Sequence, residues 1–76
     1  MISLKDVPGM EVIDKEGKNV GKVKKVDFDI EEGKINTITV SFHKGFFSHE
    51  KEIIGFKEIK NISDNVLLDI EIFTGD

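Results

Sequence analysis

The fold is set by VGKVKKVDFDI at residues 20–30, EEGK at 31–34 and INTITVSF at 35–42. The first and last of these segments alternate apolar with polar residues, which is typical of half-buried β-strands. The acidic segment between them is short and places Gly33 where a left-handed turn conformation is needed. The stretch therefore predicts a long β-hairpin, around which the rest of the chain adds short strands.

The first arm of this hairpin contains an irregularity. Val20 and Val23 lie in opposite phases of a two-residue repeat, whereas residues 26–30 alternate without a fault. A strict strand would expose one of these two sets of apolar side chains. We therefore expect a bulge or bend within residues 21–25, which would let one long strand serve both sides of a small barrel.

The second arm is the most regular strand in the sequence. Its β-branched residues favour an extended conformation. Ile38, Val40 and Phe42 are expected on one face, and Ile35 on the opposite face together with three hydroxyl-bearing residues. This pattern predicts a strand that alternates without a break.

The remainder of the chain also reads as short strands. We expect them at residues 10–13, 50–54, 60–62 and 66–73, with single helical turns at 3–6 and 56–59. Turns rich in glycine, aspartate and asparagine separate these segments, and no long stretch shows helical periodicity. The predicted fold is all-β: one domain over residues 1–76, with its core at about 4–73, forming a small closed or partly open antiparallel β-barrel of roughly five to six short strands.

Composition narrows the possible functions. The 76 residues carry a net charge of −4, which argues against non-specific binding to nucleic acid or to an anionic membrane. No apolar run approaches the roughly 20 residues that span a bilayer, so no membrane insertion is expected. The sequence has no cysteine and begins without the features of a signal peptide, so we expect a cytoplasmic location.

Several segments together resemble a known family. VIDKEGKNVGKV at residues 12–23, VDFD at 26–29 and GKI at 33–35 resemble the start of a PRC-barrel domain. KEIIGFKEI at 51–59 and DNVLL at 64–68 are similar to the closing strands of that family. Gly55 stands where the family often has proline. The resemblance implies that three glycines, namely Gly17, Gly21 and Gly33, serve the fold rather than a ligand.

The same resemblance implies a function. PRC-barrel domains act as docking modules and share no catalytic residues, so neither an enzyme nor a cofactor is expected. Members include the cytoplasmic domain of the photosynthetic reaction-centre H subunit and a domain of a ribosome-maturation protein. Short free-standing versions occur in bacteria and archaea, and some archaeal ones are linked to cell division. The composition, rich in lysine, glutamate and isoleucine, resembles that of archaeal proteins.

We therefore predict a non-enzymatic protein-interaction module that self-associates, as a homodimer for example, or binds a larger partner. Its best candidate contact surface is the pair Phe46 and Phe47, because aromatic anchors are typical of binding hot spots. The simpler interpretation is that one ring caps the barrel and the other covers a neighbouring strand. His43 and His49 flank this pair, which gives a second alternative: a metal-binding protein. No cysteine or third histidine supports a metal site.

The hairpin carries a candidate docking surface of its own. Asp27, Asp29, Glu31 and Glu32 form an acidic cluster that could contact a basic partner, or could simply be a solvated face. The resemblance to the family's ribosome-maturation member implies the alternative of a ribosome- or RNA-associated maturation factor. A modest basic strip on the hairpin would have to serve it, formed by Lys22, Lys24, Lys25 and Lys34. An RNA-binding surface would favour arginine and exposed aromatic residues, which are absent among these positions. The lysines more simply offset the carboxylates across the hairpin.

Overall fold

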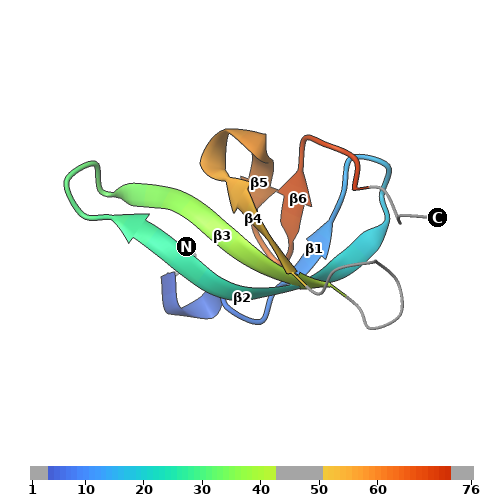
Figure 1. Cartoon of the computed structure of the whole chain (residues 1–76), viewed down its shortest axis with the longest axis horizontal. Helices are drawn as coiled ribbons and strands as arrows, with labels where there is room; N and C mark the ends of the chain where they lie inside the picture. Colours follow the sequence, from blue (N-terminus) through green and yellow to red (C-terminus); the bar gives the residue numbers. More distant parts are fainter. Residues whose placement is uncertain (1–3, 43–50, 73–76) are drawn as a thin grey trace.

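The computed structural model describes residues 4–42 and 51–72, and these form a small all-β fold (Figure 1). The strands are β1 (Glu11–Ile13), β2 (Asn19–Asp29), β3 (Lys34–Phe42), β4 (Lys51–Gly55), β5 (Ile59–Ile62) and β6 (Val66–Leu68). Two single turns of 3₁₀-helix accompany them, η1 (Leu4–Asp6) and η2 (Phe56–Glu58). The predicted fold class, with six strands and only single helical turns, is confirmed.

The strands form one curved sheet in the order β4-β3-β2-β1-β6-β5. Four of its five strand pairings are antiparallel, and the fifth, between β1 and β6, is parallel. Within the described residues the sheet is not closed, because β4 and β5 lie at its two ends and are joined through η2. The structure is therefore the partly open form of the predicted barrel, with one parallel pairing that the sequence pattern did not indicate.

The inner side of the curved sheet holds a single apolar core. The long hairpin of β2 and β3 supplies much of it and extends beyond the other strands (Figure 1). The buried apolar residues are Val7, Val12, Val20, Val23, Ile35, Ile38, Val40, Phe42, Ile54, Val66, Leu68 and Ile72. Every described strand except β5 contributes at least one of them, and β5 packs against the cluster through half-buried isoleucines.

The expected irregularity in β2 is a bulge at Lys24. Val23 pairs with Val40 of β3 and Lys25 pairs with Thr39, so Lys24 has no ladder partner on β3. This extra residue brings Val23 back into the core while Lys24 and Lys25 are both exposed. The prediction of a bulge within residues 21–25 is confirmed.

The second arm also contains a bulge, which the sequence pattern did not predict. Asp27 pairs with Thr37 and Phe28 pairs with Ile35, so Asn36 is an extra residue in β3. The bulge turns Ile35 inward, where it is buried on the same side as Ile38. The expectation that β3 alternates without a break is therefore wrong.

The last strand is shorter than predicted. β6 ends at Leu68, after which the backbone leaves the ladder and makes other hydrogen bonds. The N–H of Asp69 donates to the carbonyl of Glu58 at 2.8 Å, and the carbonyl of Ile70 accepts from Lys15 at 2.8 Å. The alternating apolar residues after Leu68 pack against the core from an irregular segment rather than from a strand.

Gly33 allows a specific test of the hairpin turn. Its φ is 68°, and its N–H donates to the carbonyl of Asp29 at 2.8 Å. We expect Gly33→Val to lower the free energy of unfolding by about 1–2 kcal/mol, because a β-branched residue resists positive φ. Gly33→Asn should cost less, because asparagine tolerates this conformation. Urea denaturation measures both, and equal stability of the valine variant and wild type would contradict this description of the turn.

Candidate functional site

The predicted aromatic contact surface cannot be placed. Phe46 and Phe47, together with His43 and His49, lie outside the described residues 4–42 and 51–72. The contact surface and the two-histidine site therefore stay predictions. The described residues contain no group of three or more histidine, cysteine, aspartate or glutamate side chains that could hold a metal ion.

The acidic cluster lies toward the end of the β2–β3 hairpin, and part of it serves the turn. Asp29 Oδ1 accepts a hydrogen bond from the backbone N–H of Glu32 at 3.1 Å. The Glu32 carboxylate lies 3.9 Å from Lys34 Nζ, with both side chains more than half exposed. An exposed pair of this kind contributes little stability. Asp27 is exposed on β2 opposite Thr37, and Glu31 is exposed in the turn.

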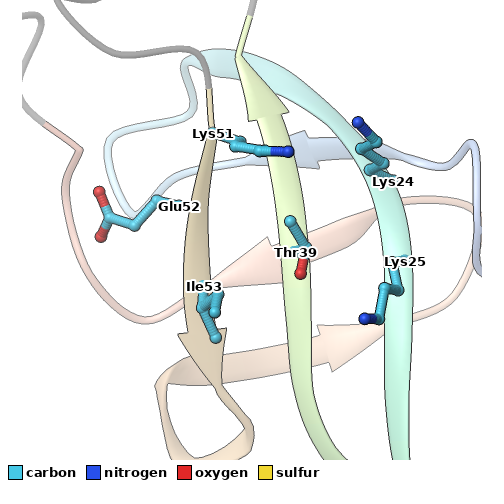
Figure 2. A pocket seen from close by; sticks show the side chains of 6 residues that line it. All are labelled: Lys24, Lys25, Thr39, Lys51, Glu52 and Ile53. Atoms are coloured by element: carbon cyan, nitrogen blue, oxygen red, sulfur yellow. The ribbon is translucent and has the colours of Figure 1, made fainter.

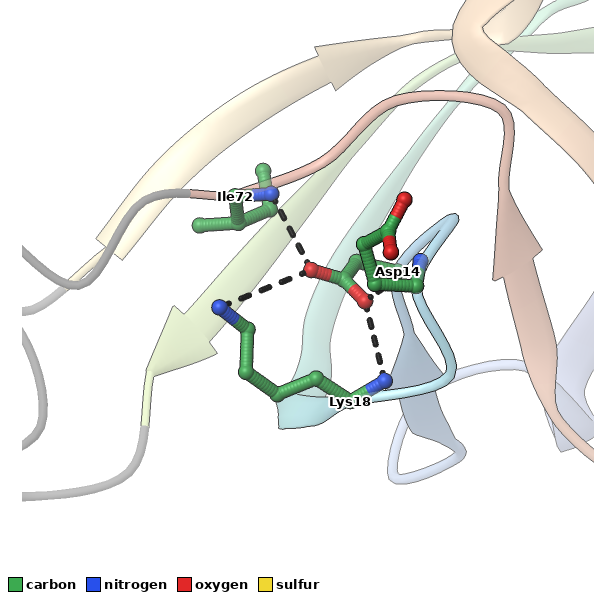
Figure 3. Close-up of polar contacts among 4 residues, drawn as sticks. Asp14, Lys18 and Ile72 are labelled. Carbon is green, nitrogen blue, oxygen red and sulfur yellow. Dashed lines mark hydrogen bonds and ion pairs between the residues drawn. The ribbon is translucent and has the colours of Figure 1, made fainter.

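The described residues contain one buried ionisable side chain, Asp14, in the turn between β1 and β2. Its Oδ1 accepts hydrogen bonds from the N–H groups of Glu16 at 3.0 Å and Lys18 at 2.9 Å. Its Oδ2 accepts from the N–H of Ile72 at 3.2 Å and lies 3.8 Å from Lys18 Nζ (Figure 3). The carboxylate thus ties the first turn to a segment 58 residues further along the chain.

This environment identifies Asp14 as a structural residue. Burial by itself raises the pKa of Asp14, but the N–H donors of Lys18, Ile72 and Glu16 and the Lys18 ammonium lower it. The net result is a pKa below the ordinary value. Because both oxygens are occupied by backbone donors and the carboxylate is held ionised, Asp14 is poorly suited to accept a proton from a substrate.

The clearest exposed surface is the outer face of β2, β3 and β4, on the side away from the core. Residues of the three strands are paired in rows across this face. The lysine row consists of Lys25, Thr39 and Ile53, and the aspartate row consists of Asp27, Thr37 and Gly55. A further row, beyond the lysine row, consists of Lys22, Ser41 and Lys51. Between the lysine and aspartate rows lies the inward-facing row of Val26, Ile38 and Ile54.

Ile53 gives the outer face an apolar centre. Its side chain is 66% exposed, whereas its neighbour Ile54 is buried in the core. Figure 2 shows Ile53 beside Thr39 and Lys25, with Lys51 and Lys24 nearby on the same side of the sheet. An open hollow of about 520 Å³ lies against these side chains. An apolar side chain encircled by polar ones is typical of a protein-binding surface.

The lysines of this face are free to meet a partner. Within residues 4–42 and 51–72, the ion pairs join Lys18 to Asp14 and Lys34 to Glu32. Lys24, Lys25 and Lys51 take part in neither, and all three are exposed. Their ammonium groups suit carboxylates of a partner, because charge complementarity steers association and sets the orientation of docking.

The sequence alone indicates part of this surface. Lys22, Lys24 and Lys25 were identified as a strip on the hairpin, but Lys51 and Ile53 were not. Adjacent residues of a strand point to opposite faces, so Ile53 and Ile54 cannot both face the core. This pair is the signal in the sequence that one of the two isoleucines is exposed. Which of them is exposed depends on the register between β4 and β3, which pairs Ile53 with Thr39 and Ile54 with Ile38.

The comparisons with known proteins agree with the fold. A protein-family model described as PRC-barrel domain matches residues 1–71 of the chain. No curated protein gives a significant match. No helix among the described residues is long and apolar enough to cross a membrane.

Proposed function

The chain belongs to the PRC-barrel domain family, and from this premise we propose that it is a non-enzymatic protein-interaction module that docks through its outer face. PRC-barrel domains are generally non-catalytic interaction modules. The observation that carries the proposal is Ile53, whose large apolar side chain is 66% exposed beside a hollow that is also lined by three lysines, Thr39 and Glu52. Such a side chain gains most by burial against a partner.

A docking role also fits the position of this face on the molecule. The ladder of β3 places Thr39 between Lys25 and Ile53, so the backbone positions of these three residues keep a fixed spacing. A surface that is ordered before binding loses little conformational entropy on association. The proposed partner is a protein with acidic groups around an apolar contact. A cytoplasmic location and a part in archaeal cell division stay predictions from composition and family resemblance.

A retention experiment tests the proposed function. We expect immobilised wild-type protein to retain a protein partner, either another protein or a second copy, that the Ile53→Asp variant loses. The introduced charge would be desolvated in the interface, and we expect retention to fall by at least about tenfold. Quantitative mass spectrometry of the retained fractions measures the difference.

The matched control is Ile30→Asp. Ile30 is 87% exposed but lies at the end of the hairpin, away from the lysine row, so this variant should retain the partner normally. Circular dichroism establishes that both variants are folded. Equal retention by Ile53→Asp and wild type would contradict docking through the outer face.

The lysines of the outer face also raise the question of whether this surface binds RNA. Asp27 and Asp29 follow the lysines along β2, and their carboxylates would repel a phosphate backbone that tracked the strand. We therefore favour a protein partner. Ribonuclease treatment before the retention experiment separates the two functions, because retention through RNA would be lost and direct retention would not.

A further inference from the structure

Charge changes sign along the outer face of β2. Taking Val26 as the centre, Lys25 lies one ladder position to one side and Asp27 lies one position to the other. Lys22 and Asp29 lie three positions to either side, because the bulged Lys24 occupies no ladder position. At its ladder positions the strand thus presents two ammonium groups and two carboxylates, placed symmetrically by ladder position about Val26, and the bulge adds a third lysine, Lys24, on the lysine side.

The residues of β3 and β4 are arranged about the same central row, which contains Val26. The lysine row contains Thr39 and Ile53, and the aspartate row contains Thr37 and Gly55 at the corresponding places on β3 and β4. A half-turn about an axis that lies in the plane of the face and crosses the strands would place one row on the other. Such a rotation is the operation that relates the subunits of an isologous dimer.

We propose that the occupant of the outer face is a second copy of this chain, docked face to face about this twofold axis. The proposal rests on the proposed function and names its partner. Lys25 of each copy meets Asp27 of the other, and Thr39 of each copy meets Thr37 of the other. Ile53 of each copy meets Gly55 of the other, so the exposed apolar side chain of one row faces the residue without a side chain.

The surface around Gly55 has room for that isoleucine. An open hollow of about 330 Å³ is lined by residues that include Thr37, Gly55 and Phe56. Phe56 is 45% exposed, which leaves apolar ring surface available to an entering side chain. Packing of Ile53 against Phe56 and the Gly55 backbone of the second copy would bury apolar area from both.

The electrostatic pairing is within reach of the side chains. Sheets that pack face to face lie about 10 Å apart. A lysine side chain spans about 6 Å from its Cα and so brings its ammonium group close to an aspartate on the opposing sheet. Each of the two pairs, Lys25 with Asp27 and Lys22 with Asp29, forms twice because of the symmetry.

The face is narrow, and this sets the expected affinity. It consists of three strands spaced about 4.8 Å apart. The area that such a face can bury is smaller than that of a standard stable interface. We expect a monomer–dimer equilibrium with a dissociation constant in roughly the micromolar range. Because charges carry much of the pairing, the dissociation constant should rise with ionic strength.

Charge reversal tests the proposal through the symmetry. We expect Lys25→Asp alone and Asp27→Lys alone each to raise the dissociation constant by at least about tenfold, because like charges then face each other twice. An equimolar mixture of these two variants should dimerise again, because residues 25 and 27 are both acidic in one variant and both basic in the other. Opposite charges therefore face each other at both contacts of the mixed dimer. The double variant Lys25→Asp/Asp27→Lys should likewise dimerise as wild type does. Sedimentation velocity over a range of concentrations measures all four samples.

The apolar contact provides a second test. Gly55→Val fills the position that Ile53 of the second copy would occupy, and we expect at least about tenfold weaker dimerisation. Ile30→Ser, at an exposed position outside the paired rows, should leave dimerisation unchanged. Thermal unfolding of each variant establishes that the monomer is folded.

The outcomes separate this inference from the proposed function. Wild-type protein that stays monomeric at high micromolar concentration would overturn the inference that a second copy occupies the outer face. The proposed docking function would still stand if wild type retained another protein that Ile53→Asp loses. A dimer that is indifferent to both single charge reversals would also overturn the inference, because self-association would then use another surface. Rescue in the mixture of single variants would support it.

Discussion

Gly21→Ala is expected to destabilise the fold by at least about 3 kcal/mol, although it adds a single methyl group. Gly21 is buried in β2, where it pairs with Val12 of β1 and with Phe42 of β3. A Cβ at this position would overlap the carbonyl oxygen of Ser41 and lie 2.9 Å from the Cα of Phe42. Backbone atoms cannot rotate away as a side chain would, so β2 and β3 must separate.

The effect is large relative to the total stability. A chain of 76 residues has a free energy of unfolding of roughly 4–11 kcal/mol. Gly55→Ala is the matched control, since its Cβ would meet only Glu58 Oε1, at the ordinary contact distance of 3.6 Å. Chemical denaturation of the two variants measures the difference. A Gly21→Ala variant as stable as Gly55→Ala would show that the two strands do not approach closely.

Asp14→Ala is expected to cost about 3–4 kcal/mol, because it leaves three backbone N–H groups without their acceptor. These groups belong to Glu16, Lys18 and Ile72. Asp14→Asn should cost less, because its amide oxygen can still accept the two bonds within the turn while the bond to Ile72 is lost. Asp64→Ala, at an exposed turn position, is the control and should change stability by less than about 0.5 kcal/mol.

The pH dependence of stability gives Asp14 a second signature. Its pKa in the folded state lies below the ordinary value of 3.8, so the unfolded state binds the proton more tightly. The contribution of Asp14 is therefore present above about pH 4 and is lost as the pH falls through the folded-state pKa. Melting temperatures measured between neutral pH and strongly acidic pH should fall less steeply in Asp14→Asn than in wild type. Equal slopes would contradict this role.

Much of the fold could be predicted because it follows from local patterns. The alternation in β2 and β3 predicted the long hairpin, and the phase break between Val23 and Val26 predicted the bulge that the structure places at Lys24. The second bulge, at Asn36, could not be predicted, because a strand with Ile35 on the outer face fits the same sequence. Only the pairing of Phe28 with Ile35 determines that Ile35 turns inward.

The candidate site was less predictable because it depends on pairing between strands. The outer face exists only once the ladder places Lys25, Thr39 and Ile53 side by side, and no local pattern specifies that register. The role of Asp14 depends in the same way on Ile72, which lies 58 residues away. In the sequence Asp14 reads as an ordinary turn residue, since its distant partner is a backbone N–H that carries no side-chain signature.

The bond between Asp14 and Ile72 has a consequence for the order in which the chain folds. The turn between β1 and β2 consists of neighbouring residues, yet its buried carboxylate is fully satisfied only after residue 72 arrives. Contacts of such long sequence separation require closure of a large loop, and they slow the search for the native state. During synthesis, the hydrogen bond from Ile72 to Asp14 can therefore form only after residue 72 has been added to the chain.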